Sequence, residues 1–228
     1  MSTTRSEEPP AMSQDQQTTL MKALDYAYEK SINGLPGFDS ARRMAETYQR
    51  SAGTPRDQAN ALIRWQVAKA GTSGFLAGLG GVLSMPVLLP ANIATVMVVQ
   101  VRMIAAIACL GGHDVGDDRV KSLVYVCLAG NSAKDVLKDV GVVVGTRLTR
   151  QMIQGLSGKT LTAINQKVGF RLLTKFGQTG AINLGKTIPL AGGVIGATFD
   201  ATATHTVGRM ARETFLVAAE ATRHPGPA

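Results

Sequence analysis

The sequence GAINLGKT at residues 180–187 matches the phosphate-loop pattern G-x-x-x-x-G-K-[ST] at every fixed position. In that chemistry the loop joins a buried strand to a helix, so that backbone N–H groups cradle phosphates while Lys186 and Thr187 reach phosphate and magnesium. The preceding stretch VGFRLLTKFGQT instead has the apolar spacing of an amphipathic helix, and Pro189 follows closely. A nucleotide-hydrolysing site is therefore the less favoured interpretation, and it is kept as an alternative.

Two serines lie in segments that partly resemble the nucleophile elbow G-x-S-x-G. Ser73 in GTSGF and Ser157 in GLSGK both lack the final glycine, and no alternation of strands and helices surrounds them. The segment GGHDVGDDR at residues 111–119 gathers one histidine and three aspartates, but without the spacing of a known zinc or calcium site. Acids near a helix start interact favourably with its dipole, so we expect capping there and no metal, cofactor or catalytic residue.

The positive charge of the chain, net +8, is concentrated in a long segment without acids. Residues 140–199 contain seven basic residues and no Asp or Glu. On a helix, Leu161, Ile164, Val168, Leu172 and Phe176 fall on one side, whereas Lys167, Arg171, Thr174, Lys175 and Gln178 fall on another. The residues before them set Arg147, Arg150, Gln151 and Gln154 against Leu148, Met152 and Leu156. This pattern is typical of basic amphipathic helices, which bind anionic membrane surfaces.

Nucleic acid is the rival ligand for such a basic segment. Aromatic residues make up only 5% of the chain, and no known nucleic-acid recognition motif is present. Anionic lipid is therefore preferred. We expect the membrane- or anion-binding residues to be Arg147, Arg150, Lys167, Arg171, Lys175 and Lys186.

A row of small residues follows the basic segment, with one residue per helical turn. It consists of Gly192, Gly196, Asp200, Thr204 and Gly208. Small residues at this spacing let another helix approach closely, so we expect a helix-packing seam. Asp200 would then enter a contact and need a partner such as Arg102.

The elements that must position these residues are predicted to be helices throughout, in a single compact domain over residues 17–220. Helices are expected from Gln17 to Asn33, from a cap at Asp39 to Arg50, after Thr54–Pro55, from Pro90 to residue 110, after Asp117 or Asp118, after Ser132 with Asp135 as a capping box, and after Pro189. The segment GVVVGT near Val142 is a candidate strand. Residues 1–16 and 221–228 are expected to be disordered polar tails. The two cysteines, both in apolar segments, favour reduced thiols and a cytoplasmic location.

Residues 70–101 contain no charged side chain and are rich in glycine. Pro86 and Pro90 divide the segment, so residues 71–90 are expected to form an apolar helical hairpin that fills the core or dips into a membrane surface. The helix after Pro90 carries Gln100 and Arg102, and an arginine near the centre of a span costs roughly 2.5 to 3.5 kcal/mol, which disfavours spanning. The predicted core includes Leu76, Leu88, Val96, Met103, Ile107 and Leu123.

Several stretches together resemble the EcsC-like family of bacterial proteins. They are LDYAYEKSINGLPG, LIRWQVAKAGTSGFLAGLGG, QVRMIAAIACLGGHDVGDDRVKSLVYVCLAG, INQKVGFRLLTKFGQTGAINLGK and IPLAGGVIGATFDATATHTVG. The resemblance covers roughly residues 20–218. It implies a membrane-linked context, since the founding member is encoded beside the subunits of an ABC transporter, and it implies no catalytic residue.

These observations predict a non-enzymatic cytoplasmic helical protein at the inner face of the membrane. Its expected partner is an anionic lipid surface or a membrane-protein complex of the ABC-transporter type. Two alternatives are kept: a hydrolase or NTPase that uses the GAINLGKT segment, and a nucleic-acid-binding protein.

Overall fold

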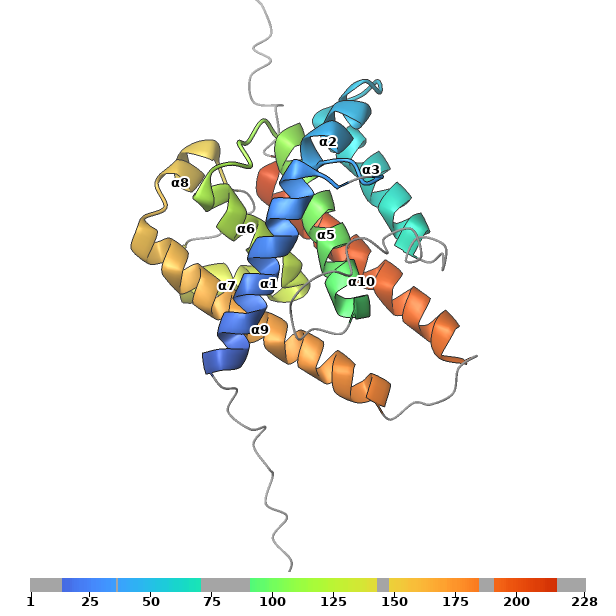
Figure 1. Cartoon of the computed structure of the whole chain (residues 1–228). Helices are drawn as coiled ribbons and strands as arrows, with labels where there is room; N and C mark the ends of the chain where they lie inside the picture. Colours follow the sequence, from blue (N-terminus) through green and yellow to red (C-terminus); the bar gives the residue numbers. More distant parts are fainter. Residues whose placement is uncertain (1–13, 36, 71–90, 143–147, 185–190, 217–228) are drawn as a thin grey trace, which may run out of the picture.

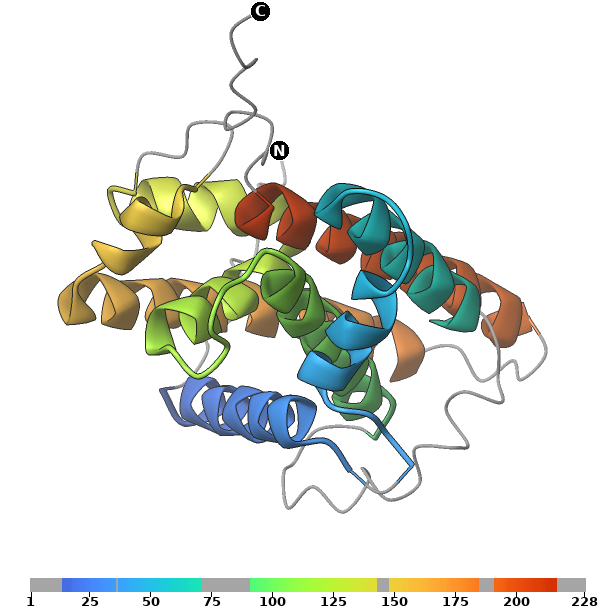
Figure 2. The same cartoon turned by 90° about the horizontal axis from the view of Figure 1, so that it is seen from above.

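A buried helix, α5 (Ala91–Leu110), lies at the centre of an all-helical domain (Figure 1). It packs against α1 (Gln14–Asn33), α2 (Ala41–Gln49), α3 (Pro55–Ala70), α6 (Asp118–Leu128) and α10 (Ala191–Phe215). Viewed from above, α1 lies on one side of α5 and the α3–α10 pair on the other (Figure 2). The remaining helices are α7 (Ala133–Asp139), α8 (Arg150–Gln154), α9 (Gly158–Leu184) and the short 3-10 helix η1 (Gly130–Ser132).

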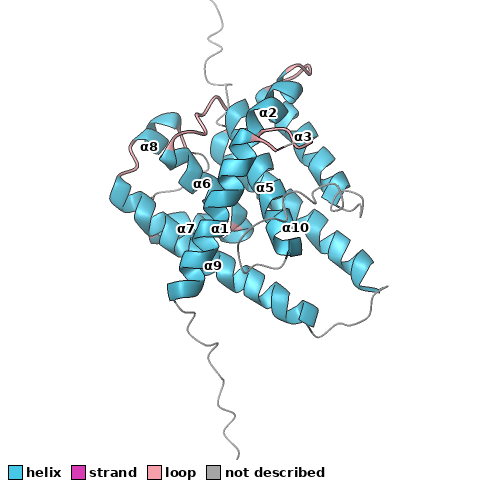
Figure 3. Cartoon of the chain, in the orientation of Figure 1, coloured by secondary structure: helices cyan, strands magenta, loops and turns pink. Residues whose placement is uncertain are grey.

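The computed structural model describes residues 14–35, 37–70, 91–142, 148–184 and 191–216. Within them, the surroundings of side chains are described except at residues 14, 16, 70, 91–95, 175–184 and 191–200. Across these ranges the secondary structure is helical, apart from one isolated bridge between Leu35 and Phe38, which confirms the predicted fold class (Figure 3). The apolar hairpin expected at 71–90 lies outside the described residues, as do residues 143–146 of the GVVVGT segment.

Most helix boundaries follow the capping signals of the sequence. Gly34, with a φ of +78°, ends α1, and α1 begins at Gln14, slightly before the expected Gln17. The Thr54 hydroxyl accepts from the Asp57 backbone N–H at 3.2 Å, and the Asp57 carboxylate accepts from the Thr54 N–H at 3.0 Å, so the two residues cap α3 reciprocally. Asp117 caps α6 by accepting from the Arg119 N–H at 2.8 Å.

Two predicted caps were wrong. Ser40, rather than Asp39, caps α2 by accepting from the Arg43 N–H, while the Asp39 carboxylate pairs with the Arg43 side chain at 3.7 Å. Ser132 makes no capping hydrogen bond to α7, because it already has helical φ and ψ angles at the end of η1, whereas capping requires an extended residue.

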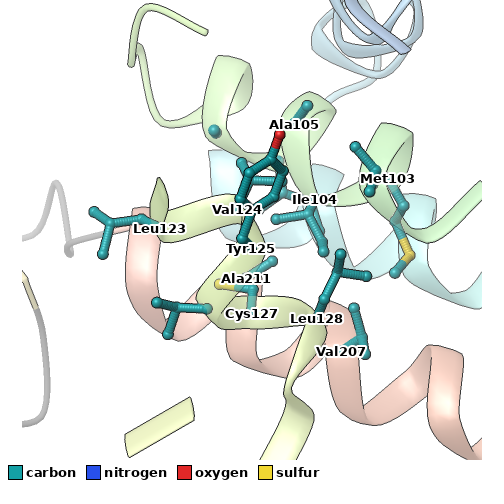
Figure 4. Packing of buried hydrophobic residues seen from close by; sticks show 14 of the residues in the cluster. Met103, Ile104, Ala105, Leu123, Val124, Tyr125, Cys127, Leu128, Val207 and Ala211 are labelled. Atoms are coloured by element: carbon teal, nitrogen blue, oxygen red, sulfur yellow. The ribbon is translucent and has the colours of Figure 1, made fainter. Parts of the chain in front are cut away.

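The core is built where α5, α6 and α10 meet. Met103 and Ile104 of α5 lie near Leu128 of α6, and Val207 and Ala211 of α10 close the cluster (Figure 4). The predicted core residues Met103, Ile107 and Leu123 are fully buried, and Val96 is half-buried. Leu76 and Leu88 lie outside the described residues.

Candidate functional site

Helix α9 carries the described part of the basic segment and presents two different faces. Ser157 caps its first turn, since its hydroxyl accepts from the Thr160 N–H at 3.2 Å. Ile164, Val168 and Leu172 are fully buried, and the helix packs against α1, α6 and α7. The amphipathic pattern predicted from the sequence is therefore confirmed for residues 161–172, where the apolar side of α9 faces the core.

The solvent side of α9 combines basic residues with an exposed aromatic ring. Lys167, Phe170 and Arg171 are all exposed, and the phenylalanine side chain has 56% of its surface accessible. Lys167 Nζ lies 3.7 Å from Asp139 Oδ2 of α7, with both side chains about half exposed. Arg171 makes no hydrogen bond or ion pair within the described part of the chain. We call Lys167, Phe170 and Arg171 the α9 face.

The other predicted basic residues do not all join the α9 face. Arg150, at the start of α8, donates from Nη2 to the Gly112 carbonyl at 2.9 Å, so its side chain ties α8 to the turn between α5 and α6. Lys175 lies on α9, but the surroundings of its side chain are outside the described residues. Arg147 and Lys186 lie outside the described residues altogether. The structure thus brings Lys167 and Arg171 together, one turn apart, and directs Arg150 elsewhere.

The apolar partners of the basic segment differ at one position from those expected. Leu148 and Leu156 are buried, but Met152 is 39% exposed and Ile153 is buried in its place. Helix α8 is only five residues long, so the expected apolar side of a longer helix is not formed there.

The predicted helix-packing seam is described at its C-terminal end. Gly208 of α10 lies against Ile63 of α3, and Gln100 of α5 donates to the Thr204 hydroxyl at 3.3 Å. The first three residues of the row, Gly192, Gly196 and Asp200, lie on α10, but their surroundings are outside the described residues.

The surroundings of Asp200 are outside the described residues, and its expected partner, Arg102, makes its described contacts elsewhere. Arg102 donates from Nη1 to the Asp39 carbonyl at 3.1 Å, and its guanidinium carbon lies 3.3 Å from the centre of the Phe38 ring. Burial lowers its pKa to about 10, so the side chain is charged at neutral pH. These described contacts of Arg102 are therefore made to the connection between α1 and α2.

Comparison with known families matches residues 9–217 to the EcsC protein family. The chain belongs to the EcsC family. No curated protein and no solved structure matches it.

In this EcsC-family protein the phosphate-loop pattern has no strand before it. The residues that precede it form α9, and the backbone of Gly180–Leu184 continues the same helix. A phosphate loop needs converging backbone N–H groups, which a continuous helix uses in its own hydrogen bonds.

Lys186 and Thr187 lie outside the described residues. Ser157 is the α9 cap, and Ser73 is outside the described residues.

The acidic and histidine-containing segment of this EcsC-family chain is used for turns and caps. Asp114 accepts from the Gly116 N–H at 2.9 Å and pairs with Arg42 at 2.8 Å, and these contacts lower its pKa. His113 Nε2 lies 3.0 Å from the Phe215 carbonyl oxygen at the end of α10. Over the described residues, no group of three or more His, Cys, Asp or Glu is placed to hold a metal.

Phe170 of this family member is absent from the residues predicted from the sequence. The signal was present, because a helical step of about 100° per residue places position 170 beside position 167 and on the side of the helix opposite Val168. Among the described helices, none has the length and apolar character needed to cross a bilayer. Residues 97–108 of helix α5 are buried within the protein. The next residue, Cys109, is half-buried.

Proposed function

We propose that this EcsC-family protein is a non-enzymatic, peripheral membrane-binding protein that docks its α9 face on an anionic lipid surface. The observation that carries the proposal is the exposed Phe170 ring on the same side of α9 as the exposed Lys167 and Arg171, on a helix that contains no acid. An aromatic ring flanked by basic side chains is typical of helices that lie in the membrane interface. The site would be the inner face of the cytoplasmic membrane, as the charge pattern suggests.

The magnitudes support reversible attachment. A basic side chain near an anionic surface contributes on the order of 1 kcal/mol, and burial of a phenylalanine contributes roughly 1.5 to 3 kcal/mol. The exposed pair between Lys167 and Asp139 offsets up to about 1 kcal/mol of this. The described α9 face alone would therefore bind weakly, and Arg147, Lys175 and Lys186 of the same segment would strengthen the attachment if they face the same surface.

Arg150 is left out of this lipid-binding set. Its guanidinium already donates to the Gly112 carbonyl, so contact with lipid would break a hydrogen bond that links two parts of the fold. Two basic residues of the same segment would therefore have different roles. Arg171 would contact lipid, and Arg150 would stabilise the fold.

The test is flotation of the purified full chain with vesicles of phosphatidylcholine, with and without phosphatidylglycerol, at low and high salt. Binding should need the anionic lipid and weaken with salt. The variant Lys167→Gln/Arg171→Gln should bind at least several-fold more weakly. The matched control is Arg50→Gln/Arg64→Gln, which removes the same charge from exposed positions near α2 and on α3 and should bind as the wild type does.

The variant Phe170→Ser separates insertion from charge attraction. It should reduce the binding that survives high salt while leaving the salt-sensitive part. Equal binding by all variants, or no binding to anionic vesicles, would overturn the proposal. Retention of nucleic acid, or of a membrane-protein complex, in place of vesicles would assign the basic segment to that other ligand.

A further inference from the structure

Three arginines of α3 and α10 lie close enough for the charges of Arg56 and Arg209 to act on Arg212, on helices that the α9 face does not include. Arg212 and Arg209 lie on the C-terminal half of α10, and Arg56 lies in the first turn of α3, which packs alongside α10 (Figure 2). Arg56 is exposed, and the two α10 arginines are half-buried. We call these residues the arginine cluster.

Neutral amides, rather than carboxylates, hold two of the three guanidinium groups. Arg212 Nη1 donates to Asn60 Oδ1 of α3 at 2.5 Å, and Arg209 Nη2 donates to Asn131 Oδ1 of η1 at 3.2 Å. An amide oxygen orients a guanidinium group without cancelling its charge. The arginines are therefore positioned, and their charge is left uncompensated by these contacts.

The nearby carboxylates have other partners. Glu213 lies 3.8 Å from Lys134 of α7, and the Asp57 carboxylate accepts from Thr54 in the α3 cap while its charge also interacts with Arg56.

Arg212 keeps one buried donor atom free for a further partner. Its Nε atom is buried and has no hydrogen-bond partner among the described residues. Burial, followed by the charges of Arg56 and Arg209, lowers its pKa, while Glu213 acts in the opposite direction. The two arginine neighbours thus disfavour the charged form of Arg212, and a bound anion would relieve that repulsion.

We propose that Arg56, Arg209 and Arg212 form a binding site for a phosphate-type oxyanion, separate from the α9 face. Guanidinium groups present forked N–H donors that match the geometry of phosphate oxygens, and an anion would bridge the helices α3 and α10. The phosphate comes either as a free anion or on a lipid headgroup, and the chemistry of the site is the same for both.

The first arm of the test is titration of the full chain with inorganic phosphate at constant ionic strength, followed by calorimetry and by the arginine Nε–H resonances in NMR. Binding should shift the Arg212 resonance and be at least about tenfold weaker in Arg212→Gln, as expected for loss of a charged hydrogen-bonding group. Arg56→Gln, at an exposed position, should weaken binding without affecting the fold. Arg50→Gln is the charge-matched control and should bind as the wild type does.

The second arm uses vesicles that contain phosphatidic acid, with the protein carrying Lys167→Gln/Arg171→Gln so that the α9 face is disabled. Phosphate binding that depends on Arg212 in the first arm identifies a free-anion site. Retention on these vesicles that depends on Arg212 and Arg56, without phosphate binding, identifies a headgroup site. If neither ligand responds to Arg212→Gln or to Arg56→Gln in protein that is folded by circular dichroism, the proposal is overturned.

Discussion

Gly208 of α10 lies so close to Ile63 of α3 that a Cβ atom at position 208 would be 2.7 Å from Ile63 Cγ1 and 3.0 Å from Ile63 Cγ2. Both residues are buried, and the contact joins two helices that are far apart in the sequence. The seam expected from the small-residue row is therefore a real point of helix contact at its C-terminal end, and the glycine is needed for lack of space rather than for backbone conformation.

Replacement of Gly208 by alanine should destabilise the protein by about 1 to 3 kcal/mol, because the added methyl group overpacks the α3–α10 contact. Urea unfolding would measure this loss. Gly158→Ala is the control, since nothing lies within 4 Å of a Cβ there. In an Ile63→Ala background, Gly208→Ala should lower the free energy of unfolding by less than it does in the wild type. An unchanged cost in that background would mean that Ile63 is not the obstacle.

Arg150→Gln should lower the free energy of unfolding by about 1 to 2 kcal/mol, because the charged donor to the Gly112 carbonyl is lost. Vesicle binding should stay at the wild-type level. The comparison with Arg171→Gln is informative, since that change should reduce vesicle binding and leave stability unchanged. Lower vesicle binding in Arg150→Gln at full stability would return Arg150 to the lipid-binding set.

His113 should make the stability of the protein depend on pH between about pH 7 and 5. Burial lowers its pKa from the ordinary 6.5, the hydrogen bond to the Phe215 carbonyl opposes this, and Arg150 adds to the lowering. His113 of the unfolded chain therefore takes up a proton at a higher pH than His113 of the folded protein. The stability that neutral His113 contributes is present above the pKa of the unfolded state and is lost as the pH falls through the pKa of the folded state.

Unfolding in urea at pH 7.5 and at pH 5.5 tests the role of His113. His113→Gln keeps a donor for the Phe215 carbonyl and removes the titration, so its stability should fall less on acidification than that of the wild type. His205→Gln, at an exposed position of α10, should keep the wild-type difference. An identical pH dependence of the free energy of unfolding in all three proteins would show that His113 does not cause it.

Local signals in the sequence predicted most helix ends. Thr54 followed by Pro55, Asp117 and Gly34 each act on backbone atoms within a few residues, so no tertiary information is needed to interpret them. Ser132 failed as a predicted cap because the chain enters α7 through a 3-10 turn, which depends on how α6 ends against its neighbours.

The contacts of the long basic side chains could not be predicted in the same way. Arg150 reaches a carbonyl 38 residues earlier in the chain, and Arg212 reaches an asparagine 152 residues away. Both contacts depend on helix packing, which charge counts do not contain. Phe170 is a different case, because its position on the polar side of α9 follows from helical spacing alone.

Phe170 and Leu172 provide the most direct contrast between the surface and the core of α9, since the first is 56% exposed and the second is fully buried. Leu172→Ala should cost about 2 to 5 kcal/mol of stability through the cavity that it leaves. Phe170→Ala should change stability by no more than about 0.5 kcal/mol, as surface substitutions usually do, and should weaken vesicle binding. Urea unfolding and flotation of both variants would test this separation. A large loss of stability in Phe170→Ala would show that the ring packs on the protein, and the α9 face would then lack the apolar anchor on which membrane docking depends.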